Sequence, residues 1–320
     1  MSSIGAVRAS NAAFEHSRDQ PPIAIFVGGT SGVGQGMAEV FARNTHGRSH
    51  IILVGRNCTG AEKILAQLPN PDPGHFSREF LYCDLTHLKN VQALTQDILS
   101  KYPKINYLVI TAGFMALGGR NETQEGNDRK LAVHYYSRWK LIHDLIPALK
   151  RAKAGGEHAS VMSVLAAGKG GAIDVIHRMD DLAVKDGYWM MKLSLLAPTY
   201  NDLMLESFAE IEPSLPFIHS YPGFVRTTIM ATSPSWLFRT ISTALFTLTR
   251  PFSVSMEESG QYMWNGIYNV ATTPGAWRTG YNGEDIGKTR YFGDENQRQK
   301  LWEHTKEVMA RSLGANAPPK

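Results

Sequence analysis

The chain has 320 residues, of which 43% are hydrophobic and 19% charged, and a formal net charge of +4 that is spread along the sequence. This composition excludes a disordered or fibrous chain, and the absence of basic runs gives no sign of a nucleic-acid partner. Two cysteines, Cys58 and Cys83, are too few for a disulfide framework, so we expect a reducing, cytoplasmic location.

The N-terminal segment lacks the continuous apolar core of a secretory signal. Residues 1–20 mix small, polar and charged side chains, and we expect them to form a flexible extension. A transit peptide is the alternative, favoured by Arg8 and Arg18 but disfavoured by Glu15. No internal repeat or linker follows, so we expect a single domain over residues 21–320.

Short β-branched or aliphatic runs alternate with helix-length stretches along the domain. The predicted strands are residues 23–27, 51–54, 80–83, 107–110, 160–162 and 217–219. The helical stretches carry apolar residues at spacings of three and four, notably over residues 33–43, 88–101, 128–150 and 188–210. This alternation predicts an α/β fold with a Rossmann-type doubly wound, mostly parallel sheet and helices on both faces. Ligands of such folds bind beyond the carboxyl ends of the strands.

A glycine-rich turn joins the first predicted strand to the first helix. Gly28 permits a tight turn, Gly32 lets backbone approach a pyrophosphate, and Gly34 allows the helix to pack closely on the strand. Unpaired N–H groups at the helix N-terminus favour anions. The alternative is a glycine-rich loop without a binding role, which the position between the first strand and the first helix disfavours. We therefore expect a dinucleotide to be held by Gly28, Thr30, Ser31, Gly32, Val33 and Gly34.

The end of the second strand discriminates between cofactors. It carries no acidic residue that would hold the ribose 2′-hydroxyl of NAD. Arg56 instead places a guanidinium where a 2′-phosphate would receive charge-assisted hydrogen bonds. A solvated surface arginine is the alternative. We expect NADP(H), with Arg56 and Asn57 at this end of the cofactor.

Three residues suggest the chemistry. Tyr188 and Lys192 stand four residues apart, which puts a phenol and an ammonium one turn apart on one helix face. A nearby cation lowers the pKa of a tyrosine and makes its hydroxyl a usable general acid or base. Ser163, at the end of the fifth strand, is placed to hydrogen-bond a developing oxyanion. The alternative for the Tyr188 and Lys192 pair is an exposed helix face, with the lysine stem packed on the ring.

In this order the motifs resemble those of the short-chain dehydrogenase/reductase family. Gly28, Gly32 and Gly34 match its glycine turn, Asp84 and Leu85 its adenine-contacting acidic position, and Thr111, Ala112 and Gly113 its strand-four turn. Ser163, Tyr188 and Lys192 match its catalytic serine, tyrosine and lysine. Residues 222–227 resemble the segment that closes on the nicotinamide.

The resemblance implies further roles and associations. It implies cofactor contacts for Lys192 at the ribose and for Pro222, Gly223, Val225 and Thr227 near the carboxamide. Residues 131–140, with His134, Tyr135, Tyr136, Ser137 and Arg138, are particularly similar to family members from filamentous fungi, many of which serve natural-product pathways. Family members commonly associate through long helices, so a homodimer is the default expectation.

Two features depart from the family pattern. His134 stands where the family uses an asparagine in its proton relay, and it is either a relay or a satisfied core histidine. Ser163 and Tyr188 are farther apart than in the family, and residues 168–187 are expected to form an extra loop over the pocket. Two acidic residues in this loop, Asp180 and Asp181, lack partnered histidines, so we assign no metal.

The last third of the chain is less regular. Residues 228–252 carry an apolar helical stripe where a substrate lid is expected, which predicts a hydrophobic substrate. The stretch is too short for a confident transmembrane segment, and contact with a membrane surface or a partner subunit is the alternative. Residues 295–313 have a helical pattern without an assigned function.

These observations predict an NADPH-dependent oxidoreductase, a ketoreductase or alcohol dehydrogenase. Its substrate would be a small hydrophobic carbonyl compound or alcohol, in secondary metabolism. Tyr188 would act as general acid/base, Lys192 would lower its pKa, and Ser163 would stabilise the oxyanion. The alternative is a nucleotide-binding protein of this fold without net redox turnover, such as an isomerase, a cyclase or a binding module. His134 and the long separation of Ser163 from Tyr188 motivate it.

Overall fold

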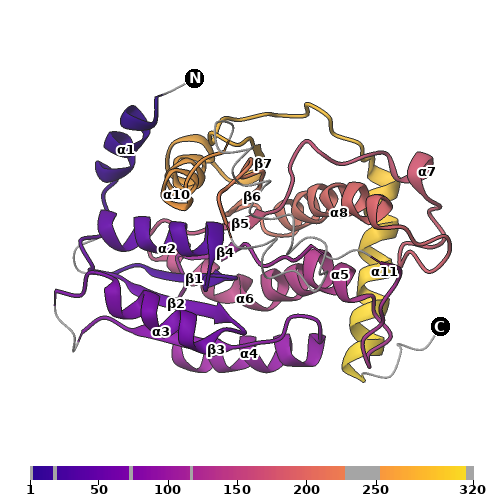
Figure 1. The fold of residues 1–320 in the computed structure, drawn as a ribbon, viewed down its shortest axis with the longest axis horizontal. Coiled ribbons are helices and arrows are strands. Elements are labelled where there is room, and N and C mark those ends of the chain that lie inside the picture. The colour runs from indigo at the N-terminus through magenta and orange to yellow at the C-terminus, as the bar shows by residue number, and fades with distance from the viewer. Residues whose placement is uncertain (1–2, 17–19, 72–74, 116–117, 228–252, 315–320) are drawn as a thin grey trace.

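A computed structural model shows one parallel sheet and describes residues 3–16, 20–71, 75–115, 118–227 and 253–314. The strand order is β3-β2-β1-β4-β5-β6-β7 (Figure 1). The strands are β1 (Ile23–Val27), β2 (His50–Gly55), β3 (Arg78–Tyr82), β4 (Tyr107–Ile110), β5 (Ser160–Val164), β6 (Pro216–Ser220) and β7 (Gly275–Thr279). The predicted α/β class with a doubly wound parallel sheet is confirmed.

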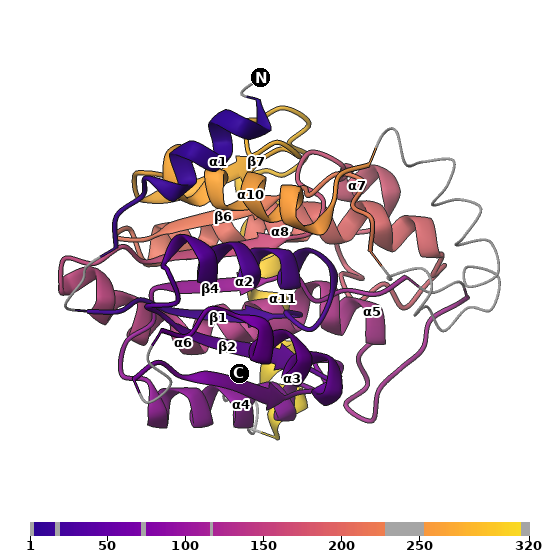
Figure 2. The same cartoon turned by 60° about the vertical axis from the view of Figure 1, so that its left-hand side comes forward.

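Helices cover both faces of the sheet. On one face lie α2 (Gly32–Asn44), α3 (Cys58–Gln67) and α10 (Met256–Asn265), followed by the π-helical turn η3 (Gly266–Val270). On the other lie α4 (Leu88–Lys101), α6 (Ser137–Ala154), α8 (Met190–Ile211) and α11 (Glu295–Leu313). The short α5 (Arg129–Leu131) and the π-helical turn η1 (Ala132–Tyr136) lead into α6, and α7 (Ile173–Ile176) precedes α8. Figures 1 and 2 show this layering.

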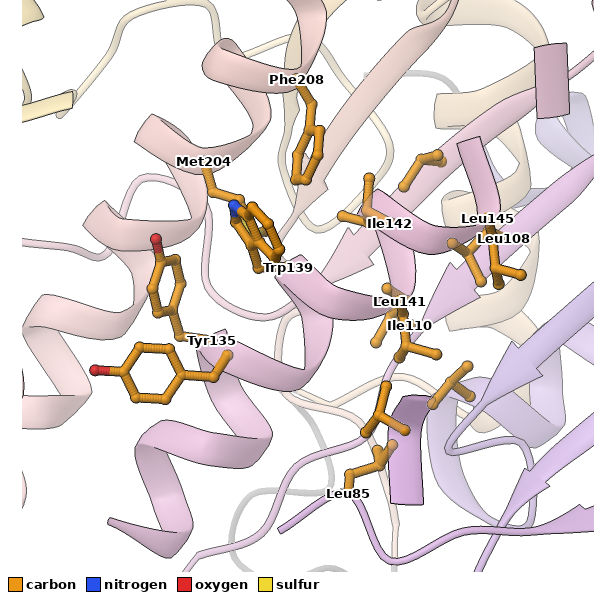
Figure 3. Close-up of a cluster of buried hydrophobic side chains, with 14 of the residues drawn as sticks. Leu85, Leu108, Ile110, Tyr135, Trp139, Leu141, Ile142, Leu145, Met204 and Phe208 are labelled. Carbon is orange, nitrogen blue, oxygen red and sulfur yellow. The ribbon is translucent and has the colours of Figure 1, made fainter. Parts of the chain in front are cut away.

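The central strands β1, β2 and β4 are almost entirely apolar because both of their faces are buried. In β1, Ile25 and Val27 join the core under α4, α6 and α8, whereas Ala24 and Phe26 join the core under α2 and α10. Figure 3 shows part of the first core, where Leu108 and Ile110 of β4 lie beside Leu145 and Leu141 of α6. Trp139 of α6 and Phe208 of α8 belong to the same cluster.

Two elements lie outside the predicted pattern. Part of the expected loose extension forms α1 (Ile4–Ala12), which packs on α10 (Figure 2). There the Asn11 amide donates to the backbone and side-chain oxygens of Gln261, both at 2.8 Å. The seventh strand, β7, was not predicted because it is an edge strand with partly exposed residues and no aliphatic run.

The predicted apolar lid, residues 228–252, lies outside the described residues. Across the described ranges, no helix is long and apolar enough to cross a membrane.

The closest helix contact joins α2 to α10 across two glycines. A Cβ at Gly36 would lie 2.0 Å from the Met256 carbonyl oxygen, and one at Gly260 would lie 2.6 Å from the Gly36 carbonyl oxygen. Both distances are far below van der Waals contact, so the helices pack backbone against backbone only because neither residue has a side chain.

We expect Gly36→Ala to destabilise the fold by about 1–3 kcal/mol, because the added methyl group forces α2 away from α10. Urea denaturation measures this loss. Gly5→Ala is the matched control, since Gly5 also lies in a helix but its new Cβ would come no closer than 3.9 Å to another atom. Stability of Gly36→Ala equal to that of the wild type would contradict the close contact.

Three histidines are held neutral by the fold. Burial lowers the pKa of His134 to about 3 and the pKa values of His16 and His304 to about 4. Unfolding returns each to about 6.5, so the unfolded chain binds more protons below that pH. We expect the free energy of unfolding to fall as the pH drops from about 6.5 to about 4, by about 1.4 kcal/mol per unit for each histidine.

Denaturation at several pH values checks this, with His304→Gln as the test variant. Glutamine still offers a hydrogen-bond partner to the Tyr136 hydroxyl, which lies 2.7 Å from His304 Nε2, but it does not titrate. The dependence of stability on pH should therefore become shallower. An unchanged slope would show that His304 does not contribute to it.

Candidate active site

A cavity of about 750 Å³ opens at the carboxyl ends of β1 to β4, within the size range of small-molecule and cofactor sites. Of the residues predicted to contact the cofactor, those on its wall are Gly28, Thr30, Ser31, Gly32, Val33, Arg56, Asp84, Leu85, Thr111, Ala112, Gly113 and Thr227. Asp128, Arg129 and Lys130 of the α5 region also line it. The cavity is therefore assembled from the ends of several strands, as the parallel fold predicts.

The glycine turn has the geometry of a phosphate cradle. Gly28 adopts φ +92° and its N–H donates to Val54 O at 2.8 Å, which ties the turn to β2. A Cβ at Gly34 would lie 2.5 Å from Thr111 Oγ1, so glycine is needed where α2 crosses the end of β4. The N-cap of α2, Ser31, makes no side-chain capping bond. The first N–H groups of α2 thus face the cavity without a capping side chain and suit an anionic oxygen.

Arg56 and Asp84 lie together at the end of the cavity beyond β2 and β3. Burial would raise the pKa of Asp84, but hydrogen bonds from the Thr86 N–H (3.0 Å) and hydroxyl (2.9 Å), and the Arg56 charge, outweigh it and hold the pKa below its usual range. Asn57 does not line the cavity. Its side chain caps α3 by accepting from Gly60 N–H at 3.0 Å.

The segment predicted to close on the nicotinamide reaches the cavity only at its end. Thr227 lines the cavity, and its Cγ2 lies 3.2 Å from the position of a Cβ on Gly32. Pro222, Gly223 and Val225 do not line it; Gly223 turns the chain with φ +74°, and Val225 forms a bridge with Val254.

Ser163 does not line the cavity and lies within a buried hydrogen-bond network. Its hydroxyl accepts from Arg138 Nη1 at 2.6 Å and donates to Asn201 Oδ1 at 2.8 Å. The Asn201 amide in turn donates to His134 O at 2.9 Å. Because the serine hydroxyl is fully buried and bonded on both sides, its role in this conformation is to join β5 to α6 and α8.

Tyr188 does not lie on the helix that the spacing predicted. The helix α8 begins at Met190, two residues later, so Tyr188 and Lys192 are not one helical turn apart. The Tyr188 hydroxyl donates instead to Asp128 Oδ1 at 3.4 Å, and Lys130 Nζ lies 5.6 Å from the centre of its ring. Burial, followed by the Asp128 charge and hydrogen bond, raises the pKa of Tyr188. The expected lowering by Lys192 is absent from this conformation.

Lys192 has a different partner. Its ammonium lies 3.3 Å from His177 Nδ1, and His177 Nε2 lies 3.1 Å from Asp181 Oδ2. The sequence interpretation that Asp181 lacks a partnered histidine was therefore wrong. Among the described residues, however, no group of three or more His, Cys, Asp or Glu side chains is placed to hold a metal ion.

His134 is partly buried, and its acceptor nitrogen is engaged. Its Nε2 accepts the Phe114 N–H at 3.2 Å, and burial, followed by the charges of Arg138 and Lys130, lowers its pKa to about 3. In this conformation the Nε2 lone pair is therefore not free to accept a proton in the relay that the sequence left open.

Sequence reasoning missed several polar residues of the site. Arg138, Asn201, Asp128 and Lys130 are all buried, although charged and amide side chains are mostly exposed in proteins. Lys130 Nζ has no hydrogen-bond partner within the described structure, and burial lowers its pKa although Asp128 opposes this. The sequence feature that could have revealed the buried Arg138 is its position on the apolar face of the helix predicted over residues 128–150.

The site combines a preformed glycine-rich cradle, suited to a dinucleotide, with three polar groups that lie apart from one another. The glycine turn and Arg56 fit a phosphate-bearing cofactor by cavity size, by free N–H groups and by charge. The Ser163 hydroxyl, the Tyr188 phenol and the Lys192 ammonium each bond to a different partner.

Comparison with known proteins agrees with this geometry. Residues 22–177 match the short chain dehydrogenase family. Oxidoreductase AN1596 of Emericella nidulans is 36% identical over 264 residues, which cover 82% of this chain and 75% of the relative. Human polyprenol dehydrogenase is 26% identical over 302 residues, covering 89% of this chain and 84% of that protein.

Solved structures share the fold. The NADPH-bound carbonyl reductase from chicken fatty liver superposes with a TM-score of 0.56 at 14% identity, covering 84% of this chain and 99% of that one. At this identity the likeness shows the fold alone. The sequence relatives and the family match establish more: the chain belongs to the short-chain dehydrogenase/reductase family and is an oxidoreductase of that family.

Proposed function

We propose that the protein is an NADP-dependent oxidoreductase that reduces an apolar carbonyl compound, or oxidises the corresponding alcohol. The observation that carries the cofactor choice is Arg56, which lines the cavity directly after β2 in the absence of a carboxylate there. A guanidinium suits a 2′-phosphate, whereas NAD binding favours an acidic residue at this place.

Relatives support the substrate class. The human relative is named for a polyprenol, a long apolar alcohol, and the Emericella relative is itself an oxidoreductase. Together with the apolar stretch at residues 228–252, the name of the human relative supports an apolar substrate. The resemblance of residues 131–140 to fungal family members is the basis for proposing a role in secondary metabolism.

Tyr188 is the proposed proton donor in the reductive direction. In this conformation burial and Asp128 raise the pKa of the phenol and make it a weaker acid, so donation to a carbonyl oxygen requires a cation to replace Asp128 beside it. Bound NADPH would supply the hydride to the carbonyl carbon. The chain's part is to hold the substrate, break the Tyr188 O–H bond toward the new alcohol oxygen, and stabilise the remaining phenolate with the Lys192 ammonium.

This reaction requires a rearrangement of the site. The Tyr188 hydroxyl bonds to Asp128 in the structure, so it must leave that carboxylate and approach Lys192 before it acts on a substrate oxygen. The Lys192 ammonium has three N–H groups, so it can keep its contact with His177 while another N–H turns toward the phenol. Ser163 must give up its bond to Asn201 to reach an oxyanion.

The separation of these groups also favours a second candidate, a protein that binds the nucleotide without net redox turnover. NADPH absorbance discriminates between the two. Loss of absorbance with ketones, aldehydes or enones supports the oxidoreductase, whereas conversion of substrate at constant absorbance supports an isomerase or cyclase.

Arg56→Ala should weaken NADPH binding about 10- to 100-fold, because a charge-assisted contact with the 2′-phosphate is lost, and should leave NADH binding unchanged. Fluorescence titration measures both affinities. Arg48→Ala is the control, since Arg48 is exposed and lies before the opposite end of β2. Equal effects of Arg56→Ala on both nucleotides would show that the cofactor choice is wrong.

Tyr188→Phe should reduce kcat about 10²- to 10⁴-fold by removing the proton donor, while NADPH binding persists. Steady-state kinetics and a binding titration measure the two effects. Tyr102→Phe serves as control, because the Tyr102 hydroxyl bonds to Glu79 away from the cavity. Wild-type turnover in Tyr188→Phe would remove this phenol from the mechanism.

A further inference from the structure

The extra loop at residues 168–187 contains a buried histidine that faces the Lys192 side chain. His177 follows α7, and its side chain is 4% exposed. Its Nδ1 lies 3.3 Å from Lys192 Nζ, while its Nε2 lies 2.9 Å from Asp181 O and 3.1 Å from Asp181 Oδ2. One imidazole therefore connects the loop carboxylate to the lysine of α8.

These contacts fix the tautomer of the imidazole. Nε2 faces two acceptors of Asp181, so this nitrogen carries the hydrogen and donates it. In the neutral ring Nδ1 is then an acceptor, as a neighbouring ammonium requires. The three side chains form a directed series in which the Lys192 ammonium donates to His177 and His177 donates to Asp181.

Asp181 is itself fixed by the loop backbone. Its Oδ1 accepts from the Lys185 N–H at 3.0 Å and its Oδ2 accepts from the Asp186 N–H at 2.8 Å. Burial would raise the pKa of Asp181, but these bonds and His177 outweigh it and hold the pKa below its usual range. The carboxylate is therefore a permanent acceptor for His177.

The loop also leaves room for the lysine. Gly187 has φ +54°, and a Cβ there would lie 3.3 Å from Lys192 Nζ. A residue with a side chain would be strained by this φ and would crowd the ammonium. The end of the loop is thus shaped around the path of Lys192.

We propose that His177 is a positioning residue that orients the Lys192 ammonium, with Asp181 setting its tautomer. The extra loop then contributes to the chemistry as well as covering the pocket. His134 does not provide this contact, because its Nε2 accepts from Phe114. The inference rests on the proposed function only where it treats Lys192 as the cation of the reaction.

Three substitutions separate positioning from packing. His177→Leu fills similar space without an acceptor. His177→Gln restores both roles, since its amide oxygen accepts from Lys192 and its NH₂ donates to Asp181. Asp181→Asn removes the charge but keeps two oxygens beside His177 Nε2, the amide oxygen and the backbone oxygen at 2.9 Å, so it separates the charge of Asp181 from its effect on the tautomer.

The first readout does not need turnover. Brief acetylation with acetic anhydride, followed by mass spectrometry, compares the reactivity of Lys192 with that of exposed Lys89 in the same protein. Loss of a hydrogen bond to the charged form raises the fraction of free amine, so we expect about tenfold faster labelling of Lys192 in His177→Leu, and labelling at the wild-type rate in Asp181→Asn, which keeps the tautomer. His177→Gln should label like the wild type.

The second readout is kinetic. We expect kcat for NADPH-dependent reduction to fall about tenfold or more in His177→Leu, and to stay near the wild-type value in His177→Gln and Asp181→Asn. Equal Lys192 labelling in all variants, or a His177→Gln protein that behaves like His177→Leu, would overturn the proposal. The expected labelling pattern without any hydride transfer by the wild type would support the assignment of His177 and reject the proposed function.

Discussion

A buried guanidinium holds together the strand ends on which the site is built. Arg138 donates to Ile110 O at 3.2 Å and Ala112 O at 2.6 Å at the end of β4, and to Val164 O at 2.9 Å at the end of β5. Burial lowers its pKa to about 9, so it remains charged at neutral pH. Removing this side chain would leave several buried acceptors without donors, a large destabilising change.

Arg138 also explains why the site divides into two parts. By fixing the carbonyl of Ala112 it fixes the turn after β4, against which Gly28 and Gly34 pack to shape the cradle. The cradle is therefore preformed by the close packing of the glycine turn against the turn after β4. The same guanidinium engages the Ser163 hydroxyl, so the serine is part of the scaffold in this conformation.

The groups that carry the proposed chemistry belong to more adaptable structure. Tyr188 lies in the irregular segment before α8, and its bond to Asp128 is a long one at 3.4 Å. Lys192 is on the first turn of α8, but its partner belongs to the extra loop. A rigid cofactor cradle beside repositionable proton donors is consistent with an enzyme whose catalytic arrangement is completed by its ligands.

The sequence was sufficient for the elements that follow from periodicity. The strands buried on both faces, the glycine turn and the helix at residues 295–313 all appear where their patterns predicted them. The sequence was insufficient where tertiary contacts decide where a helix begins and which partner a side chain contacts. The four-residue spacing of Tyr188 and Lys192 predicted one helix face, but α8 begins after Tyr188, whose ring lies instead against Lys130.

Contacts between residues that lie far apart in the sequence or in irregular segments could not be predicted from the sequence either. The contact of Arg138 with strand ends, and that of His177 with Lys192, join segments whose approach depends on the whole fold. Asn57 shows the opposite case. Its position next to Arg56 suggested a contact with the cofactor, but its side chain caps the local helix α3.

The most direct test of the account is a crystal structure of the protein with NADP bound. The account predicts that the Arg56 guanidinium contacts the 2′-phosphate and that the Tyr188 hydroxyl has left Asp128 to face the nicotinamide, with Lys192 beside it. A bound nucleotide with Tyr188 still on Asp128 and no cation near its hydroxyl would contradict the account.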